Sequence, residues 1–390
     1  MGYSDSGLKE RKKFKIAFDA RPAQSVGGGV QTYSLNIIKQ LGKLTEKFDF
    51  IFIVDSKLEV SHISFPPNAQ FIRTSVGRDS WFLRDIWMQF ILPQKLKRMG
   101  VHLFHQPDYI IPIRPVQFAL VTSFLDAIAF TPVDDRNILS KLRVKFLIRR
   151  GSKNTDAIIT ISDYSKYELL KYLDIRPKKI TTVWCNITET YFYPYTHQVA
   201  VSCLKKLNFK DDFIFYFGGF IKRKNVELLL DAYKIILQKR NIKLVMAGKI
   251  NKRIMEKIEF LGISKMVKVF GFAKEEELKV LLDKCATFVF PSAMEGFGLP
   301  VAEALAVGAP VVCSKNGSLP EIGGDAVYYF EGSGPSELAE VIFDVIDDSI
   351  LRKKLRTKGQ KRAMMFNEEQ SRRKLSKLYT QILASKFSHA

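Results

Sequence analysis

The sequence has few of the features that mark secreted, metal-binding or membrane-spanning proteins. Its four cysteines include no Cys-x-x-Cys pair, and its five histidines are scattered without metal-ligand spacing. Reduced, mostly buried thiols are therefore predicted rather than disulfides or a zinc site. No apolar run reaches the ~18 residues of a spanning helix. The longest candidate, Phe118 to Phe130, is too short and contains Asp126.

Three signatures of nucleotide and metal chemistry are also absent. The run from Val26 to Gln31 is rich in glycine but does not fit Gly-x-Gly-x-x-Gly, which disfavours a dehydrogenase. The chain has no Gly-x4-Gly-Lys-Ser/Thr, so a P-loop kinase or ATPase is not expected. It also has no Asp-x-Asp with which to clamp a metal on a diphosphate, and no metal site is assigned.

The composition is that of a globular protein with an anionic partner. Apolar residues make up 46% and charged residues 26% of 390 residues, enough for two domains of ~150–200 residues. The net charge of +21 suits nucleic acid, a membrane surface or phosphorylated ligands, or a surface that is merely lysine-rich. Charge alone does not choose among them.

Strand-like and helical segments alternate twice, which predicts two α/β halves with mainly parallel sheets. The strand-like runs are residues 14–19, 48–54, 101–105, 118–121 and 157–161, and then 213–217, 243–247, 267–270, 287–290, 310–313 and 326–330. Residues 194–210 show no clear periodicity and are interpreted as a linker. The predicted domains are 1–196 and 197–368, and a C-terminal helix at 369–390 is expected to pack back toward the first domain.

The most informative segment runs from Pro291 to Pro310. A strand ends at Phe290, a loop with two glycines follows, and Pro300 stands where the first turn of a helix is expected. Gly308 would end that helix. Free N–H groups and the helix dipole at such a helix start bind anions, and a diphosphate suits the carboxyl edge of a parallel sheet.

Two glutamates frame this predicted anion site. Glu295 lies in the loop, and Glu303 lies about one turn inside the helix. A carboxylate suits hydroxyl groups rather than phosphates, so Glu303 is a candidate for a ribose diol and Glu295 for hydroxyls of a donor sugar. The alternative is that both are solvated surface acids.

This segment resembles the signature of retaining GT-B glycosyltransferases of the large family numbered four, also called group 1. The pattern is Glu-x7-Glu within Pro-Ser-x-x-Glu-Gly-Phe-Gly-Leu-Pro-x-x-Glu-Ala-Leu-Ala-x-Gly-x-Pro-Val-Val, and weaker matches cover nearly the whole chain. The resemblance implies a GT-B fold, in which two Rossmann-like domains face each other across a cleft. It also implies that the donor-binding residues include Phe297, Gly298, Leu299 and Glu303.

A basic loop upstream resembles the family's loop after the first strand of the nucleotide domain. It runs from Tyr216 to Asn225 and contributes Gly218 and Gly219 to the donor site. Arg223 and Lys224 are predicted to act in catalysis with Glu295, because two cations stabilise the charge that develops on a leaving diphosphate. A plain basic helix start is the alternative, although cations there oppose the helix dipole. Many relatives carry arginine where this chain has Gly219.

Matches in the first half point to the acceptor side or the cleft between domains. The candidate residues are Gly28, Gly29, His105 and Asp126. Many relatives have a His-Asp pair where this chain has Leu125-Asp126. Activity can survive this change if the family uses the backbone at that position, and not if it needs the imidazole.

The resemblance implies transfer of a mannose- or glucose-type hexose from a nucleotide diphosphate sugar to a glycan or lipid-linked acceptor. It implies retention by front-face attack with the leaving phosphate as base, without a metal or a cofactor beyond the sugar donor. The alternatives are a GT-B epimerase or phosphorylase acting on a sugar, and a basic nucleic-acid-binding protein, for which no recognition module is visible. Nucleic acid is therefore not an expected partner.

Two basic stretches predict peripheral attachment to an anionic membrane. Residues 80–98 combine Trp81, Trp87 and other apolar residues with arginines and lysines, and residues 136–153 hold seven lysines and arginines and no acid. Such stretches suit an anionic membrane face, although core packing with a solvated basic rim explains them equally well. The expected location is the cytoplasm, and membrane attachment through these stretches would place the protein at the inner face of the membrane.

Overall fold

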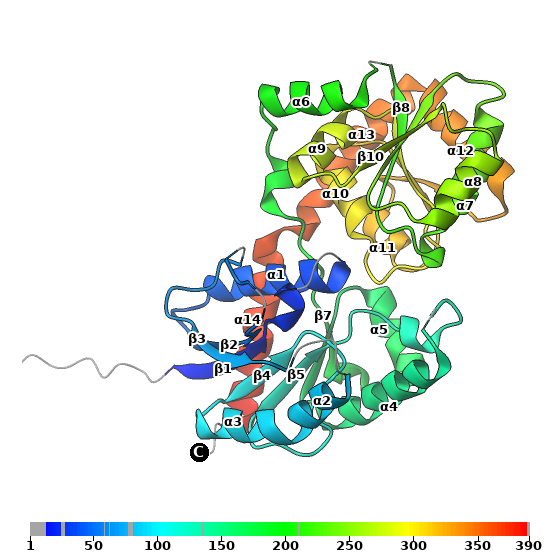
Figure 1. Ribbon diagram of the computed structural model, residues 1–390. Coiled ribbons are helices and arrows are strands. Elements are labelled where there is room, and N and C mark those ends of the chain that lie inside the picture. The colour runs from blue at the N-terminus through cyan, green and yellow to red at the C-terminus, as the bar shows by residue number, and fades with distance from the viewer. Residues whose placement is uncertain are drawn as a thin grey trace, which may run out of the picture. The chain divides into compact units, whose positions relative to one another are not determined.

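The protein is described from a computed structural model (Figure 1). The structure describes residues 13–24, 28–57, 59–61, 63–76, 81–134, 136–209 and 211–387, apart from the side chain of Trp81. The chain divides into two compact units. The first consists of residues 1–123, 146–158 and 375–390, and the second of residues 124–145 and 159–374.

Two parallel sheets organise the chain, as predicted. The first has seven strands in the order β3 (Gln70–Thr74), β2 (Phe48–Asp55), β1 (Phe14–Asp19), β4 (Leu103–Gln106), β5 (Ala119–Ser123), β6 (Ala157–Thr160) and β7 (Ile180–Thr182). The second has six, in the order β10 (Val267–Gly271), β9 (Lys243–Ala247), β8 (Phe213–Phe217), β11 (Thr287–Phe290), β12 (Val311–Ser314) and β13 (Tyr328–Phe330). The order reverses between β1 and β4 and between β8 and β11, and ligand sites favour the carboxyl ends of strands at such points.

Helices connect the strands. They are α1 (Gly29–Gly42), α2 (Trp81–Ile86), α3 (Leu92–Arg98), α4 (Ile138–Asn154), α5 (Asp163–Tyr172), α6 (His197–Leu207), α7 (Val226–Ile236), α8 (Lys252–Phe260), α9 (Glu275–Lys284), α10 (Leu299–Val307), α11 (Leu319–Gly323), α12 (Pro335–Asp347), α13 (Ser349–Ala363) and α14 (Glu368–Phe387). A π-helical segment, Trp87–Ile91, joins α2 to α3. Within the described residues, no helix is both long enough and apolar enough to cross a bilayer.

The first sheet buries different side chains on its two faces because strand residues alternate. Ala17 and Phe104 share a core with Met88, Leu92 and Leu96 from the segment α2 to α3. On the opposite face Phe18 pairs in register with His105, and the His105 ring contacts Tyr379 of α14. The sheet is therefore covered on both faces, as buried parallel strands require.

The linker interpretation of residues 194–210 is wrong for most of that segment, because α6 occupies His197–Leu207. The Thr196 side chain caps it by accepting a hydrogen bond from the Val199 backbone N–H at 3.3 Å. Cys203 and Leu207, four residues apart on one helical face, are buried. Two short strands, β3 and β7, were also not predicted. All four cysteines are buried free thiols, as expected.

Candidate active site

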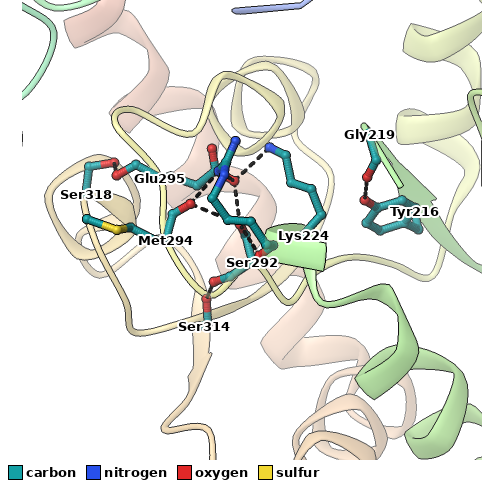
Figure 2. A network of polar contacts seen from close by, with 9 residues as sticks. Tyr216, Gly219, Lys224, Ser292, Met294, Glu295, Ser314 and Ser318 are labelled. Carbon is teal, nitrogen blue, oxygen red and sulfur yellow. Dashed lines mark hydrogen bonds and ion pairs between the residues drawn. The ribbon is translucent and has the colours of Figure 1, made fainter. Parts of the chain in front are cut away.

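The carboxyl ends of β8 and β11 bring together the three residues predicted to act in catalysis. The loop after β8 forms a short 3-10 turn, Lys222–Lys224, and Glu295 lies in the loop between β11 and α10. Although 71 positions separate them in sequence, the Lys224 ammonium Nζ lies 2.7 Å from the Glu295 carboxylate oxygen Oε1 (Figure 2). The Arg223 guanidinium Nη1 lies 3.0 Å from the same oxygen. The site therefore sits where the strand order of the second sheet reverses.

Glu295 and Lys224 are both largely buried, and their charges are balanced locally. Burial opposes ionisation of Glu295, but Lys224 and then Arg223 outweigh it and hold the pKa of this carboxyl below its ordinary value. Burial likewise lowers the pKa of Lys224, against the stabilising charge of Glu295. The Lys224 ammonium also lies 4.8 Å from the centre of the Phe290 ring. Charges held out of water act strongly on a ligand placed beside them.

Three serines that were not among the predicted site residues hold this loop in place. The Ser292 hydroxyl donates to Glu295 Oε1, and the Ser314 hydroxyl donates to the Ser292 carbonyl (Figure 2). The Glu295 carbonyl accepts from the Ser318 hydroxyl at 3.1 Å. The Arg223 carbonyl accepts from the Ala293 backbone N–H at 2.9 Å, which ties the two loops directly. The position of Ser292 in the Pro-Ser-x-x-Glu motif is the signal that could have identified it as a site residue.

Helix α10 begins and ends as the sequence predicts. Gly298 precedes it with φ 95° and Gly308 ends it with φ 86°, both in the left-handed region that favours glycine. A Cβ on Gly298 would also lie 2.6 Å from Leu319 Cδ2. The first N–H groups of a helix have no intrahelical partner, so the start of α10 suits an anion. The Phe297 side chain is buried, and its ring packs edge-on against Phe366.

The glycines after β8 are tightly packed on one side and open on the other. Gly218 has φ 145°, and the Tyr216 hydroxyl donates to the Gly219 carbonyl at 2.7 Å. A Cβ on Gly248 would lie 2.9 Å from the Gly218 carbonyl oxygen. A Cβ on Gly219 would meet no atom within 4 Å, so there is space beside this residue. That space suits the approach of a donor, the role predicted for these glycines.

Asp126 and Leu125 lie against the glutamate loop within the second unit. A Cβ on Gly296 would lie 2.9 Å from both the Leu125 carbonyl oxygen and Asp126 Cβ, so only glycine fits there. Burial raises the pKa of Asp126; the Glu295 charge adds to this, while the Ile128 backbone N–H and Arg223 oppose it. The Leu125–Asp126 segment therefore lies directly against Gly296, and an aliphatic side chain stands where many relatives have histidine.

The other residues predicted for the acceptor side belong to the first unit. His105 is completely buried, with Nδ1 2.5 Å from the Tyr379 hydroxyl and Nε2 2.8 Å from the Ser123 hydroxyl. Burial lowers the pKa of His105 to about 3, so the ring is neutral at physiological pH. Gly28, with φ 101°, and Gly29 form the start of α1. Roles for these residues at an acceptor stay predictions.

Glu303 lies on α10, one turn beyond the glutamate loop, and is half-buried. Burial, and then the nearby charge of Glu275, raises its pKa to about 8. The two glutamates therefore differ: Glu295 is paired and ionised, whereas Glu303 is mostly protonated at neutral pH. Among the described residues, no three His, Cys, Asp or Glu side chains gather in a way that could hold a metal ion.

Comparison with known proteins agrees with this geometry. Residues 204–362 match the family described as "Glycosyl transferases group 1". Residues 204–362 form a group 1 glycosyl transferase domain. O-antigen chain mannosyltransferase B of Escherichia coli is 25% identical over 374 residues, covering 91% of this chain and 96% of that protein. The serotype-specific mannosyltransferase WbdA of Escherichia coli is 30% identical over 224 residues, but these cover only 27% of its length.

Solved structures establish the fold. Sucrose-phosphate synthase from Thermosynechococcus elongatus superposes with a TM-score of 0.77 at 20% identity, covering 96% of this chain and all of that one. HepE from Anabaena, solved with UDP and glucose, gives a TM-score of 0.74 at 18% identity over 94% of this chain. The predicted GT-B fold with two Rossmann-like domains is therefore confirmed. The charged cluster and α10 both lie inside the matched glycosyl transferase domain.

If Glu303 holds a ribose diol as predicted, its raised pKa predicts a pH-dependent affinity for nucleotide. A ribose diol that donates two hydrogen bonds favours the ionised carboxylate, so binding should release a proton. Affinity for GDP or UDP should then rise with pH by up to ~10-fold per unit and level off above about 8. Calorimetry between pH 6 and pH 9, in buffers of different ionisation enthalpy, measures both the affinity and the released proton.

Two variants complete this test of Glu303. Glu303→Ala should weaken nucleotide binding by roughly 1–3 kcal/mol and abolish the pH dependence. Glu275→Gln removes the neighbouring charge, so the affinity should level off at a lower pH without losing the dependence. Equal nucleotide affinity of Glu303→Ala and the parent protein would remove the ribose assignment.

Proposed function

We propose that this chain is a metal-independent, retaining hexosyltransferase that uses a nucleotide diphosphate sugar. The observation that carries the proposal is the buried cluster of Arg223, Lys224 and Glu295 beside the start of α10. Two cations and a helix N-terminus can hold a diphosphate without a metal ion. The family and the fold support a glycosyltransferase, and the cluster supports this way of activating the donor.

The proposed reaction needs no nucleophile from the protein. The bond between the sugar C1 and the diphosphate oxygen breaks, and negative charge builds on the leaving diphosphate. Arg223 and Lys224 stabilise that charge. Their interaction with the diphosphate strengthens most as the transition state is approached, so it lowers the barrier to transfer. The acceptor hydroxyl attacks C1 on the face that the diphosphate leaves, and its proton passes to a leaving phosphate oxygen. Glu295 is assigned to the donor sugar and to holding the two cations in place.

Mannose is the donor sugar that the relatives favour. Two of the similar proteins named above are mannosyltransferases, and one of them aligns along 91% of this chain. A further relative, from Campylobacter jejuni, is 27% identical over 312 residues and carries the name of a transferase acting on a diphospho-undecaprenol acceptor. These names support a mannosyl donor and a glycan or lipid-linked acceptor for this chain.

A donor panel with product analysis tests the proposed function. The full chain is incubated with GDP-mannose, UDP-glucose and UDP-galactose, with and without EDTA, and release of nucleoside diphosphate is followed. One donor should be consumed at an unchanged rate in EDTA, and NMR of the product should show the anomeric configuration of the donor. Inversion would overturn the retaining mechanism, and loss of activity in EDTA restored by Mn²⁺ or Mg²⁺ would overturn the metal-free site.

Peripheral attachment to an anionic membrane is part of the proposal, and the exposed faces of two segments support it. On α4 the apolar residues Ile138, Leu139, Leu142 and Phe146 are each more than half exposed, while Leu147 belongs to the core of the first unit. On the segment α2 to α3, Phe82, Leu83 and Ile91 are also more than half exposed. Apolar side chains surrounded by lysine and arginine are typical of helices that lie on anionic lipid.

Vesicle sedimentation tests this attachment. The parent protein should pellet with vesicles that contain anionic lipid at low salt and be released at high salt, because each cation contributes ~1 kcal/mol near the surface. A variant with Lys141, Arg143, Lys145, Arg149 and Arg150 changed to glutamine should stay in the supernatant. A control with five exposed lysines changed elsewhere should still pellet: Lys234, Lys353, Lys354, Lys361 and Lys377. If both variants behave alike, general charge rather than α4 explains binding.

A further inference from the structure

The loop between β11 and α10 is held by serine hydroxyls at two consecutive carbonyl groups. The Ser318 hydroxyl donates to the Glu295 carbonyl at 3.1 Å. The Ser162 and Ser165 hydroxyls both donate to the next carbonyl, that of Gly296, at 2.6 and 3.1 Å. All of these residues belong to the second unit. Because each peptide group is planar, fixing the two carbonyls also fixes the direction of the backbone on either side of Gly296.

These serines come from the starts of two helices. Ser162 is the N-cap of α5, where its hydroxyl oxygen accepts a hydrogen bond from the Ser165 backbone N–H at 2.9 Å. Ser318 immediately precedes α11, and its backbone N–H also donates to the Glu295 carbonyl, at 3.3 Å. The position of Glu295 therefore depends on how α5 and α11 are held against each other.

Glu321 joins α11 to α5. Its carboxylate oxygen Oε1 accepts hydrogen bonds from the Asp163 backbone N–H at 2.9 Å and from the Trp184 indole N–H at 2.8 Å. Oε2 accepts from the Tyr164 backbone N–H at 2.9 Å. The first N–H groups of a helix have no partner within it and lie at its positive end, so a carboxylate from another element stabilises them. Hydrogen bonds to an ionised group are also stronger than those between neutral groups.

The main chain at Glu321 is also anchored. The Arg362 guanidinium of α13 donates to the Glu321 carbonyl and, through Nε at 3.0 Å, to the Ile322 carbonyl. Trp184 is held in turn, because its carbonyl accepts from the Ser371 hydroxyl at 2.8 Å. Glu321 is therefore fixed between several parts of the second unit, unlike an acid that is solvated on a surface.

These contacts form a closed ring around Glu295. Helix α11 and the serine before it hold the Glu295 carbonyl, α5 holds the Gly296 carbonyl, and Glu321 ties the two helices together. We propose that Glu321 is a positioning residue for sugar transfer, which holds the loop so that the Glu295 carboxylate lies where the donor sugar binds. Its own hydrogen bonds go to α5 and Trp184, so it acts through Glu295 and not on the reacting atoms. This inference rests on the proposed transferase function and adds to it a residue outside the charged cluster.

Glu321→Gln tests this role with almost no change of shape. An amide has one acceptor oxygen, so its NH₂ group must face at least one of the three N–H donors, and that hydrogen bond is lost. The kcat for transfer should fall ~10–100-fold, because small displacements of a group that orients the substrate are costly. The Kd for GDP or UDP should stay nearly unchanged, because Arg223, Lys224 and the start of α10 are retained. In the ligand-free protein, amide hydrogen exchange at residues 292–298 should become faster.

Glu337→Gln is the matched control. The Glu337 carboxylate also accepts from three backbone N–H groups, those of Glu331 at 2.6 Å, Gly332 at 3.1 Å and Ser333 at 2.6 Å, but these lie in the turn before α12. Like Glu321, Glu337 is half-buried and belongs to the second unit. Its variant should lower the unfolding midpoint but leave both kcat and the exchange of residues 292–298 unchanged.

Ser165→Ala tests the same ring without altering Glu321. It removes one of the two hydroxyls that hold the Gly296 carbonyl, so kcat should fall and loop exchange should rise, both by less than in Glu321→Gln. If Glu321→Gln does not fold, Ser165→Ala decides the result.

The outcomes separate this inference from the proposed function. A parent protein that uses none of GDP-mannose, UDP-glucose and UDP-galactose contradicts the proposed function, and hydrogen exchange then still decides whether Glu321 holds the loop. An active parent whose Glu321→Gln and Ser165→Ala variants keep the parental kcat and loop exchange overturns the inference. An equal loss of kcat in Glu337→Gln, or a parallel loss of nucleotide affinity in Glu321→Gln, also overturns it, because either result indicates a general effect on folding.

Discussion

Alanine at Arg223 or Lys224 is expected to lower the rate of sugar transfer by ~10²–10³-fold, as for other groups that stabilise developing charge. The reason is that both cations lie beside Glu295 at the start of α10, where the leaving diphosphate is proposed to gain charge. The double variant should be no more active than either single one. The measurement is the transfer rate at saturating donor, with nucleotide affinity determined in parallel.

Lys222→Ala is the matched control for these two variants. Lys222 lies in the same 3-10 turn, but its side chain is exposed and does not reach Glu295. Its alanine variant should keep nearly the full rate, whereas Lys224→Arg should recover part of what Lys224→Ala loses because the positive charge is restored. A near-normal rate in the double alanine variant would contradict the role of the two cations.

Glu295→Ala should destabilise the ligand-free protein by ~3–5 kcal/mol, because it leaves the largely buried Lys224 ammonium and the partly buried Arg223 guanidinium without their partner. Burial of Glu295 and Lys224 justifies this size, since an exposed pair contributes only ~0–1 kcal/mol. The pair Lys315 and Glu331, 2.8 Å apart but mostly exposed, provides the matched control. Glu331→Ala should change the free energy of unfolding by less than ~1 kcal/mol.

Nucleotide should partly rescue the stability of Glu295→Ala but not its activity. A bound diphosphate supplies negative charge to Arg223 and Lys224, so GDP or UDP should raise the unfolding midpoint more in this variant than in the parent. Sugar transfer should still fall, because the donor sugar loses the carboxylate proposed to contact it. Unfolding curves with and without nucleotide measure the effect, and an unchanged stability without ligand would show that the cations do not depend on Glu295.

Local sequence signals located most of the strands. The runs 213–217, 243–247 and 287–290 coincide with β8, β9 and β11, because buried parallel strands are short, continuous apolar segments. Pro300 and Gly308 predicted the two ends of helix α10, because their backbone preferences act within a few residues. The missed elements lack such signals: β7 has three residues, and β3 lies at the sheet edge with alternating exposure.

Helix α6 shows why the predicted linker was wrong. The signals that form it are modest, a threonine cap and a buried face of Cys203 and Leu207. Intrinsic propensity is a weak guide in such a segment, and packing decides whether the helix forms. The fold of this stretch therefore depends on the neighbouring helix α9, which α6 contacts.

The sequence by itself identified the chemical groups that are proposed for the donor site, since the Pro-Ser-x-x-Glu motif and the basic loop contain Glu295, Arg223 and Lys224. The tertiary structure alone decided that they touch, because contacts across 71 residues follow from the strand order β8 to β11 and not from local pattern. It also decided the pKa values of the two glutamates, since these depend on burial and neighbouring charge. The two glutamates illustrate this: the cations hold the pKa of Glu295 low, while burial raises that of Glu303 to about 8.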